Sequence, residues 1–421
     1  MEWTVQLSKA AGRQAGQGWA VAALASIPLV MTLGNSMLIP VLPAMERHLD
    51  ITPLQSSLLI TMYSVVAILF IPLAGYISDR IGRKMVIVPS LLLAAVGGGL
   101  AGWAAWRVSD PYGWMIAGRM LQGLGAAGAF PIVLPLVGDL FPDEEEASRC
   151  LGTVETANTF GKVLSPILGA MLAGIIWFFP FFSFLVFCLL SAAMMVWSIQ
   201  VPARRERPLP FRDFIAVVAA IFRREGRWLI GVFVIGGLLM LVLFAFLFFL
   251  SSRLEDVYGI GGMRKGWVLA IPLGALCLAS FAAGKAIGDR KQRMKWGAAA
   301  GSVLLAAALA LVPLHSSLSV WLALFSVAGI GIGAALPCLD ALITEGIEKS
   351  ERGTVTSFYS SLRFIGVAAG PPLAAWLMKG GAGPLLFLLS GLALLGGALV
   401  VWLIRPEGEK GAFPLEAFPG T

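Results

Sequence analysis

The chain has 421 residues, of which 58% are hydrophobic and only 13% are charged; 31 Lys+Arg and 24 Asp+Glu give a formal net charge of +7. Soluble domains carry roughly 25% charged residues, and here apolar runs long enough to cross a bilayer recur from end to end. This composition excludes a soluble multidomain protein. Because the basic residues flank apolar runs, we interpret them as topology signals and expect no nucleic-acid partner.

Apolar runs bounded by charges or by Pro/Gly clusters predict twelve transmembrane helices, so the expected fold class is all-α integral membrane. The first run is too long for a signal peptide and lacks a small-residue cleavage site, so this helix is expected to stay in the mature protein. In chain order the predicted spans are residues 18–45, 54–78, 85–106, 112–140, 150–177, 180–201, 228–252, 266–288, 296–314, 318–344, 353–378 and 383–404.

The distribution of basic residues predicts the orientation. With the N-terminus inside, the inner loops and both tails hold 21 of the 31 Lys+Arg, whereas the outer loops hold six. This asymmetry predicts a multi-pass protein of the cell inner (plasma) membrane with both termini cytoplasmic.

The two halves of the sequence repeat. LPLVGDLFPDEEEASRCLGTV (134–154) matches LPCLDALITEGIEKSERGTV (336–355) at an offset near half the chain. Two pseudo-symmetric six-helix bundles are therefore expected, with a binding site between them near the midplane. The predicted parts are an N-terminal bundle (1–201), a cytoplasmic linker with a basic amphipathic helix (202–227), a C-terminal bundle (228–405) and a cytoplasmic tail (406–421).

The stretch AGYISDRIGRK (74–84) occupies the turn between spans two and three. Gly75 and Gly82 allow close backbone approach and a tight turn, and Asp79 could face the positive end of a neighbouring helix. The alternative is that Arg83 and its basic neighbours only signal topology.

This stretch resembles the signature loop of the major facilitator superfamily, and the twelve spans, the repeated halves and the basic central loop are similar to that family over nearly the whole chain. The resemblance implies that Asp79 caps the eleventh helix near residues 353–355 when the cytoplasmic side is shut. It also implies that Arg83 pairs with Asp139 at the end of span four. Asp340, the repeat mate of Asp139, is expected to be a gate residue as well.

Span four places Arg119 about 10 Å inside its outer end. A buried arginine must face the bundle interior and find a partner, unless it reaches outward to the interface. AGRMLQGLGAAGAF (117–130) resembles the fourth-helix motif of proton-coupled family members, with Gln122, Gly123 and Gly125 in matching places. The resemblance implies a proton-coupling role for Arg119.

Spans five and eleven carry glycine and proline at repeat-related places, which lets a helix kink and pack closely. Span five resembles the hinge motif of the drug/proton antiporters, although Ser165 replaces one glycine. The expected hinge residues are Gly161, Pro166 and Gly169 in span five and Gly366, Gly370 and Pro371 in span eleven.

Three ionisable residues lie deep in these two helices: Glu155, Lys162 and Arg363. Each costs about 2.5–3.5 kcal/mol on insertion scales unless it is paired or wetted, so one shared cavity is the economical explanation. Glu155 and Lys162 are two turns apart on one face, where a direct or water-bridged pair is expected; a purely structural ion pair is the alternative. Glu155 is the expected proton carrier, and Lys162 and Arg363 are expected to face the substrate. The other cavity candidates are Asn35, Gln122, Asn158 and Tyr359.

These features predict a secondary active transporter and not an enzyme. The first expectation is proton-coupled efflux of amphipathic drugs or related metabolites by alternating access, as in the antiporters that the chain resembles. The alternative is export of an anionic solute, such as a catecholate siderophore or organic acid, because Lys162 and Arg363 make the cavity cationic. A membrane-embedded enzyme or receptor is a remote third, since no catalytic dyad or large ligand domain is evident.

Partners follow from the same reading. The sequence has no GxxxxGK[ST] loop, so no ATP coupling is expected and the proton gradient is the expected driving force, with no cofactor and no metal. The acidic run 143–146 is interpreted as a solvated loop. A small-molecule substrate and the lipid bilayer are the expected partners of a monomer.

Overall fold

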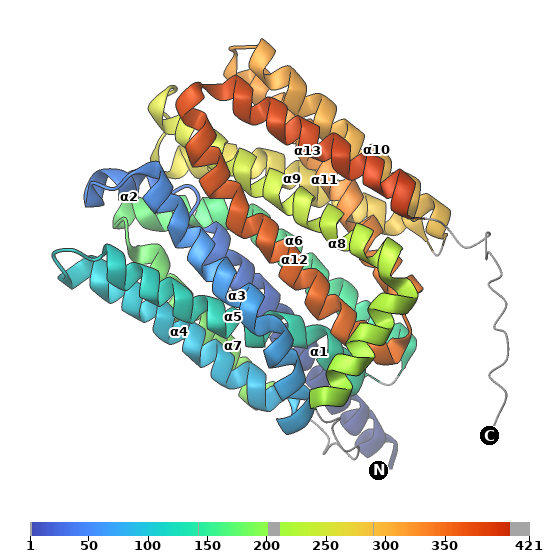
Figure 1. Cartoon of the computed structure of the whole chain (residues 1–421). Coiled ribbons are helices and arrows are strands. Elements are labelled where there is room, and N and C mark those ends of the chain that lie inside the picture. The colour runs from blue at the N-terminus through green and yellow to red at the C-terminus, as the bar shows by residue number, and fades with distance from the viewer. Residues whose placement is uncertain (1, 142, 201–210, 289, 405–421) are drawn as a thin grey trace.

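The computed structural model describes residues 2–141, 143–200, 211–288 and 290–404, and these are almost entirely helical (Figure 1). No strand occurs among them, so the predicted all-α fold is confirmed. The helices are α1 (Glu2–Ser36), α2 (Leu42–Leu49), α3 (Pro53–Ile81), α4 (Arg83–Arg107), α5 (Tyr112–Leu140), α6 (Glu144–Ile175), α7 (Phe179–Ser198), α8 (Phe211–Asp256), α9 (Gly262–Ile287), α10 (Lys291–Leu311), α11 (Leu318–Gly346), α12 (Lys349–Leu377) and α13 (Ala382–Leu403), with 3₁₀ turns η1 (Val312–Leu314) and η2 (Met378–Gly380).

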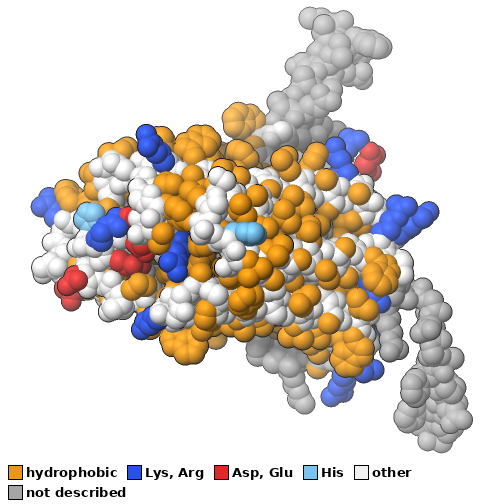
Figure 2. All heavy atoms as spheres, turned by 90° about the horizontal axis from the view of Figure 1, so that it is seen from above, with side chains coloured by type: hydrophobic (Ala, Val, Ile, Leu, Met, Phe, Trp, Pro, Cys, Tyr) orange, Lys and Arg blue, Asp and Glu red, His pale blue; other side chains and the backbone are white. Residues whose placement is uncertain are grey.

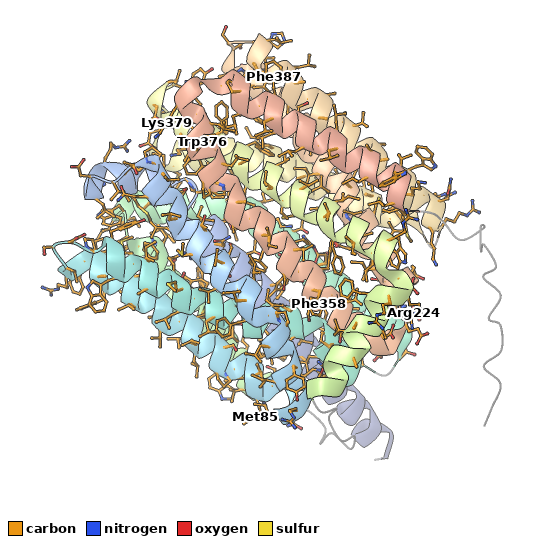
Figure 3. All side chains as sticks on the ribbon, in the orientation of Figure 1. Met85, Arg224, Phe358, Trp376, Lys379 and Phe387 are labelled. Carbon is orange, nitrogen blue, oxygen red and sulfur yellow. The ribbon has the colours of Figure 1, made fainter. Side chains whose placement is uncertain are left out.

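Eleven of the described helices are long and apolar enough to cross a membrane. The twelfth crossing is α6, which is 32 residues long but more polar, because it carries Glu155 and Lys162. The twelve-helix architecture expected from the sequence is confirmed. Figure 2 shows hydrophobic side chains over the middle of one face, with Lys and Arg toward its ends. Figure 3 shows Trp376 and Phe387 projecting from the outer surface, where they are 64% and 53% exposed.

Local sequence signals set several helix ends. Thr52 and Gln55 form a capping box at the start of α3, with Pro53 in the first turn. Gly82 separates α3 from α4 at a φ of 103°, a conformation that favours glycine. The acidic run 143–146, interpreted above as a loop, begins α6 instead, because the Asp143 side chain accepts hydrogen bonds from the backbone amides of Glu145 and Glu146.

The structure shows no break in the helix at the predicted boundary between the linker and the seventh span. α8 runs without interruption for 46 residues, so the basic amphipathic segment and the following span form one helix. No proline occurs between Phe211 and Trp228 to end it. Residues 202–210 of the predicted linker and residues 405–421, which include the predicted tail, lie outside the described residues.

Two groups of helices, α1–α7 and α8–α13, pack side by side (Figure 1). Within each half, repeat-related pairs pack closely: α1 against α6, and α8 against α12. Glycines permit this approach, since a Cβ on Gly169 would overlap the carbonyl oxygen of Met37, and one on Gly366 that of Gly237. The halves meet where α3 packs against α12 and α6 against α9.

The two ends of the bundle are named here for use below. The Gly82 side contains the α3–α4 turn and the first residues of α6 and α12. The α2 side contains α2 and the last residues of α8. In Figure 3, Met85 marks the first end and Lys379 the second.

Candidate functional site

A cavity of about 920 Å³ lies between the two halves. Its wall comes mainly from α1, α3, α5, α6, α8, α9, α11 and α12, with the first residue of α4, and it reaches the Gly82 side, where Asp79, Asp139 and Arg352 line it. No residue of α2 is among its lining residues. The space between the halves is thus continuous with one end of the molecule.

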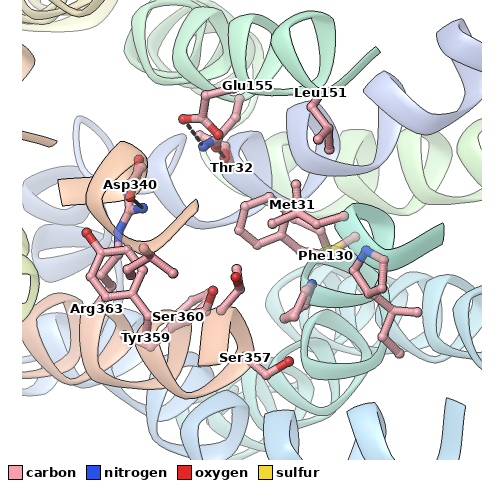
Figure 4. A pocket seen from close by; sticks show the side chains of 18 of the residues that line it. Met31, Thr32, Phe130, Leu151, Glu155, Asp340, Ser357, Tyr359, Ser360 and Arg363 are labelled. Carbon is pink, nitrogen blue, oxygen red and sulfur yellow. Dashed lines mark hydrogen bonds and ion pairs between the residues drawn. The ribbon is translucent and has the colours of Figure 1, made fainter. Parts of the chain in front are cut away.

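The three ionisable residues expected to share a cavity do so: Glu155, Lys162 and Arg363 all line it. Figure 4 shows Glu155 on one wall and Arg363 with Asp340 on the other. Asn35, Asn158 and Tyr359 also line the cavity, as predicted. The wall also has apolar members, among them Met31, Phe130 and Phe364.

Hydrogen bonds orient Glu155. The Thr32 hydroxyl of α1 donates to Asn158 Oδ1 at 2.6 Å. That contact turns the Asn158 amide nitrogen toward Glu155, where it donates to Oε1 at 3.1 Å. The carboxyl group of Glu155 is therefore held by a neutral donor and open to the cavity.

Arg363 has an acidic partner across the helix pair α11–α12. Its Nη1 lies 3.4 Å from Asp340 Oδ1, and its guanidinium lies 5.4 Å from the centre of the Tyr359 ring. Asp340 therefore lies on the cavity wall beside Arg363, and its expected gate role stays a prediction. α11 continues to Gly346, six residues beyond Asp340, whereas α5 ends one residue after Asp139.

Lys162 makes no hydrogen bond or ion pair with any residue that the structure describes. The direct Glu155–Lys162 pair expected from their spacing is not formed, because the Glu155 carboxyl is turned toward Asn158. Cavity space thus adjoins the lysine ammonium where a protein acceptor was expected.

Arg119 is fully buried and faces the bundle interior, so the alternative of an outward-reaching side chain is wrong. Its guanidinium donates to the carbonyl oxygens of Leu59 (2.6 Å) and Gly34 (3.1 Å), to Asn35 Oδ1 (2.7 Å) and to Gln122 Oε1. It therefore ties α5 to α1 and α3. Gln122 serves this tie and is not among the cavity-lining residues, so its predicted cavity position is corrected.

At the Gly82 side, Arg83 contacts Asp139 as the resemblance implies, and it lies 3.3 Å from Asp79. A Cβ on Gly75 would lie 3.6 Å from Ser357 Oγ of α12, an ordinary contact. The contact of Asp79 with α12 expected when this side is shut stays a prediction; in this state α12 begins at Lys349, so residues 353–355 lie inside the helix. Their amides are used by the helix, and only the first turn offers free N–H groups.

The predicted hinge helices are continuous. α6 runs through Gly161 and Pro166, and α12 runs through Gly370 and Pro371. Their glycines lie at close helix contacts, as described above for Gly169 and Gly366. The hinge role of the set stays a prediction.

The α2 side carries a charge cluster that the sequence analysis missed. Glu255 of α8 contacts Arg47 of α2, and it lies 2.6 Å from the ammonium of Lys265 on α9. Lys265 was counted as an outer-loop residue but is 1% exposed. Nearby, the Ser251 hydroxyl donates to the Ile39 carbonyl oxygen at 2.8 Å. The sequence signal that could have predicted this cluster is one acid and two bases, each near the end of a different helix.

Comparison with known proteins follows this geometry. A sequence model of the Major Facilitator Superfamily matches residues 24–366 and 265–418. The bacillibactin exporter of Bacillus subtilis (strain 168) is 51% identical over 371 residues, covering 88% of this chain and 92% of that protein. The multidrug efflux protein YfmO of the same organism is 25% identical over 417 residues, covering 96% and 98%.

More distant relatives share the architecture. The class C tetracycline resistance protein of Escherichia coli is 25% identical over 399 residues, covering 90% of this chain and 94% of that protein. The crystal structure of the human organic anion transporter MFSD10 (TETRAN) aligns with a TM-score of 0.72 at 20% identity, covering 91% of this chain and 99% of that one. At that identity the likeness shows the fold alone.

Proposed function

Since this chain belongs to the Major Facilitator Superfamily, we propose that it is a secondary exporter of an anionic solute, with bacillibactin as the first candidate. Family membership and the named relatives indicate a multi-pass membrane transporter rather than an enzyme. The observation that carries the anionic substrate is Lys162, which faces the cavity without a hydrogen-bond or ion-pair partner among the described residues, whereas Arg363 on the same wall is paired with Asp340. The relative named as a bacillibactin exporter supports the same choice.

Alternating access is the proposed cycle. The excess of Lys and Arg in the predicted inner loops supports a cytoplasmic position for the Gly82 side. The described state then has its cavity reaching the cytoplasm and its outer end held by the Arg47–Glu255–Lys265 cluster, which suits loading of an export substrate. Export requires the Gly82 side to shut and this cluster to open.

Glu155 is the proposed proton-binding residue. It is the acid of α6 that faces the cavity, and its neutral partner Asn158 can donate to it in either protonation state. Arg119, by contrast, is fully buried and bonded to neutral acceptors, so we assign it a positioning role. We further propose that the transporter works as a monomer in the plasma membrane, without cofactor.

Efflux of amphipathic drugs is the second candidate. Aromatic and methionine side chains on the cavity wall, such as Met31 and Phe130, suit an apolar body. Two relatives of 25% identity are named for multidrug efflux and tetracycline resistance. A cation would, however, have to enter beside Lys162 and Arg363.

A substrate panel in proteoliposomes tests the choice. The purified full chain is reconstituted, and transport of bacillibactin and of the cationic dye ethidium is measured under an imposed membrane potential and pH gradient. We expect saturable bacillibactin transport that ethidium does not inhibit. Transport of ethidium with none of bacillibactin would overturn the anionic assignment in favour of the second candidate.

A further inference from the structure

We propose that Lys162 is the residue that binds the substrate anion, and that the anion and a proton on Glu155 occupy the cavity together and leave it together. This inference rests on the proposed function. It goes further by separating the roles of the two cavity cations and by fixing the sign of the coupling between substrate and proton.

Lys162 and Arg363 differ in what surrounds them. Asp340 lies 3.4 Å from the Arg363 guanidinium, and the buried Tyr359 ring packs beside it. An anion that bound Arg363 would have to displace Asp340 or share its partner. Lys162 has no partner among the described residues, so its three N–H donors are open to an incoming carboxylate or phenolate oxygen.

The charges facing this site come from three helices. Glu155 and Lys162 are on α6, Asp340 on α11 and Arg363 on α12, and these four groups act on one another electrostatically. Two further titratable groups face them, the Tyr359 hydroxyl of α12 and the Cys277 thiol of α9. The other charged lining residues belong to the Gly82 side: Asp79, Arg83, Asp139, Glu345 and Arg352.

Formal charge decides the sign of the coupling. With Glu155 ionised, the four central charges cancel, and an entering anion meets a carboxylate on the same helix as its binding residue. With Glu155 protonated, the cluster carries one net positive charge. Anion binding is therefore favoured by the proton, and by thermodynamic reciprocity the bound anion favours protonation of Glu155.

The consequence differs from the antiport expected from the sequence resemblance. In antiport the binding of the proton and the binding of the substrate exclude each other, as they do for a cationic substrate that competes with the proton for Glu155. An anion at Lys162 instead binds more tightly when Glu155 is protonated, so each export step carries the anion and one proton outward. For a substrate with two or more negative charges the net charge moved outward is negative, and the membrane potential, negative inside, drives export.

Isothermal titration calorimetry of the detergent-solubilised full chain with bacillibactin tests both parts. Titrations in two buffers of different ionisation enthalpy give the number of protons taken up on binding. Comparison of the wild type with Glu155→Gln removes protons gained or lost by bacillibactin itself. We expect the wild type to take up more protons than Glu155→Gln near neutral pH, by at most one per site.

The same titrations identify the binding residue. Lys162→Gln is expected to weaken bacillibactin binding by about 10- to 100-fold, the range of a charge-assisted hydrogen bond, whereas Lys162→Arg should retain most of the affinity. Lys285→Gln is the matched control, because Lys285 is exposed and packs on Phe281 outside the cavity. Binding by this variant should equal that of the wild type.

Each outcome has a distinct meaning. Unchanged affinity in Lys162→Gln, or equal or smaller proton uptake by the wild type than by Glu155→Gln, overturns this inference while leaving the anionic exporter in place. Absence of bacillibactin binding to the folded wild type overturns the proposed function and this inference with it.

Discussion

Charged residues lie in different arrangements at the two ends of this transporter. At the α2 side, Arg47 belongs to the first half, whereas Glu255 and Lys265 belong to the second, so the cluster joins the halves. At the Gly82 side, the contacts of Arg83 with Asp139 and Asp79 lie within the first half. An ion pair holds a gate only when it spans the moving parts, and the Arg47–Glu255 pair at the α2 side does so.

Glycine contacts follow the same division. A Cβ on Gly266 of α9 would overlap the Pro166 carbonyl oxygen of α6, so the halves touch backbone to backbone near the α2 side. At the Gly82 side, Cβ atoms on Gly75 and Gly353 would lie 3.6 Å from Ser357 and Pro135 of the opposite half. During transport we expect the closely packed α2 side to open and the loosely packed Gly82 side to close. Four experiments test this comparison.

The largest effect is expected for Glu255→Gln. This change leaves the buried ammonium of Lys265 without its carboxylate, and breaking a buried pair costs about 3–5 kcal/mol. Thermal unfolding of the purified protein should show the loss. The double variant Glu255→Gln/Lys265→Met should recover much of it, and a double variant as unstable as the single one would contradict a role for the pair.

Gly266→Ala should have the next largest effect. The added methyl group forces α9 away from α6, an overpacking that costs about 1–3 kcal/mol. We expect the α2 side to open more often, which raises maleimide labelling of a cysteine placed at Leu42, a buried residue of α2 that does not line the cavity. Gly274→Ala on the same helix is the control, since its Cβ meets nothing within 4 Å. Equal labelling in both variants would show that the close contact does not hold this end shut.

Arg83→Gln should lower the free energy of unfolding less, by about 0.2–1 kcal/mol, because Asp79 and Asp139 are about two-fifths exposed.

The same ion pairs are expected to favour closure of the Gly82 side. Asp79→Asn should therefore raise labelling of a cysteine placed at Ser148 on the cavity wall. Wild-type labelling in Asp79→Asn would reduce this loop to a topology signal.

The smallest effect concerns Glu46 of α2. Burial raises the pKa of this carboxyl above its usual range; Asp256 and Glu255 raise it further, while the Ser56 hydroxyl and Lys265 oppose the shift. A raised pKa means that protonation favours the folded state, and this stabilisation is lost as pH rises through the folded-state value. The melting temperature should therefore rise slightly as the pH is lowered from about 8 to about 5. Glu46→Gln should remove that component of the pH profile, and an identical profile would contradict it.

The sequence was most informative inside the membrane, where a polar or charged residue without a partner has a large free-energy penalty. Apolar runs predicted the spans because unsatisfied or charged groups cannot lie in lipid, and the same cost argument placed Glu155, Lys162 and Arg363 in one cavity. α6, which falls short of the hydropathy of the other eleven spans, was also predicted from an apolar run bounded by charges.

The sequence was least informative near helix ends, where a charged side chain can reach water and has little free-energy penalty. Lys265 lies just before a predicted span and Glu255 just after another, and no prediction paired them, although tertiary packing places Lys265 in the interior beside Glu255. Asp340 was predicted as a gate residue from its repeat position, and its contact with Arg363 depends on how α11 packs against α12. Gln122 looked like a cavity residue, since nothing in the sequence shows that Arg119 uses its side chain.

The unbroken α8 connects the two ends of the molecule through a bend. Figure 1 shows the first part of this helix at an angle to the rest, and the rings of Phe222 and Phe233 lie 5.9 Å apart. In a straight helix, eleven residues would separate them by about 16 Å along the axis. Before the bend Arg224 binds Glu351 at the start of α12, and beyond it the helix lines the cavity at Leu243 and reaches the α2-side cluster at Glu255. Because α8 is bent, movement of α12 at Glu351 would change the angle between its two parts, and the distant Glu255 would shift less than in a straight helix.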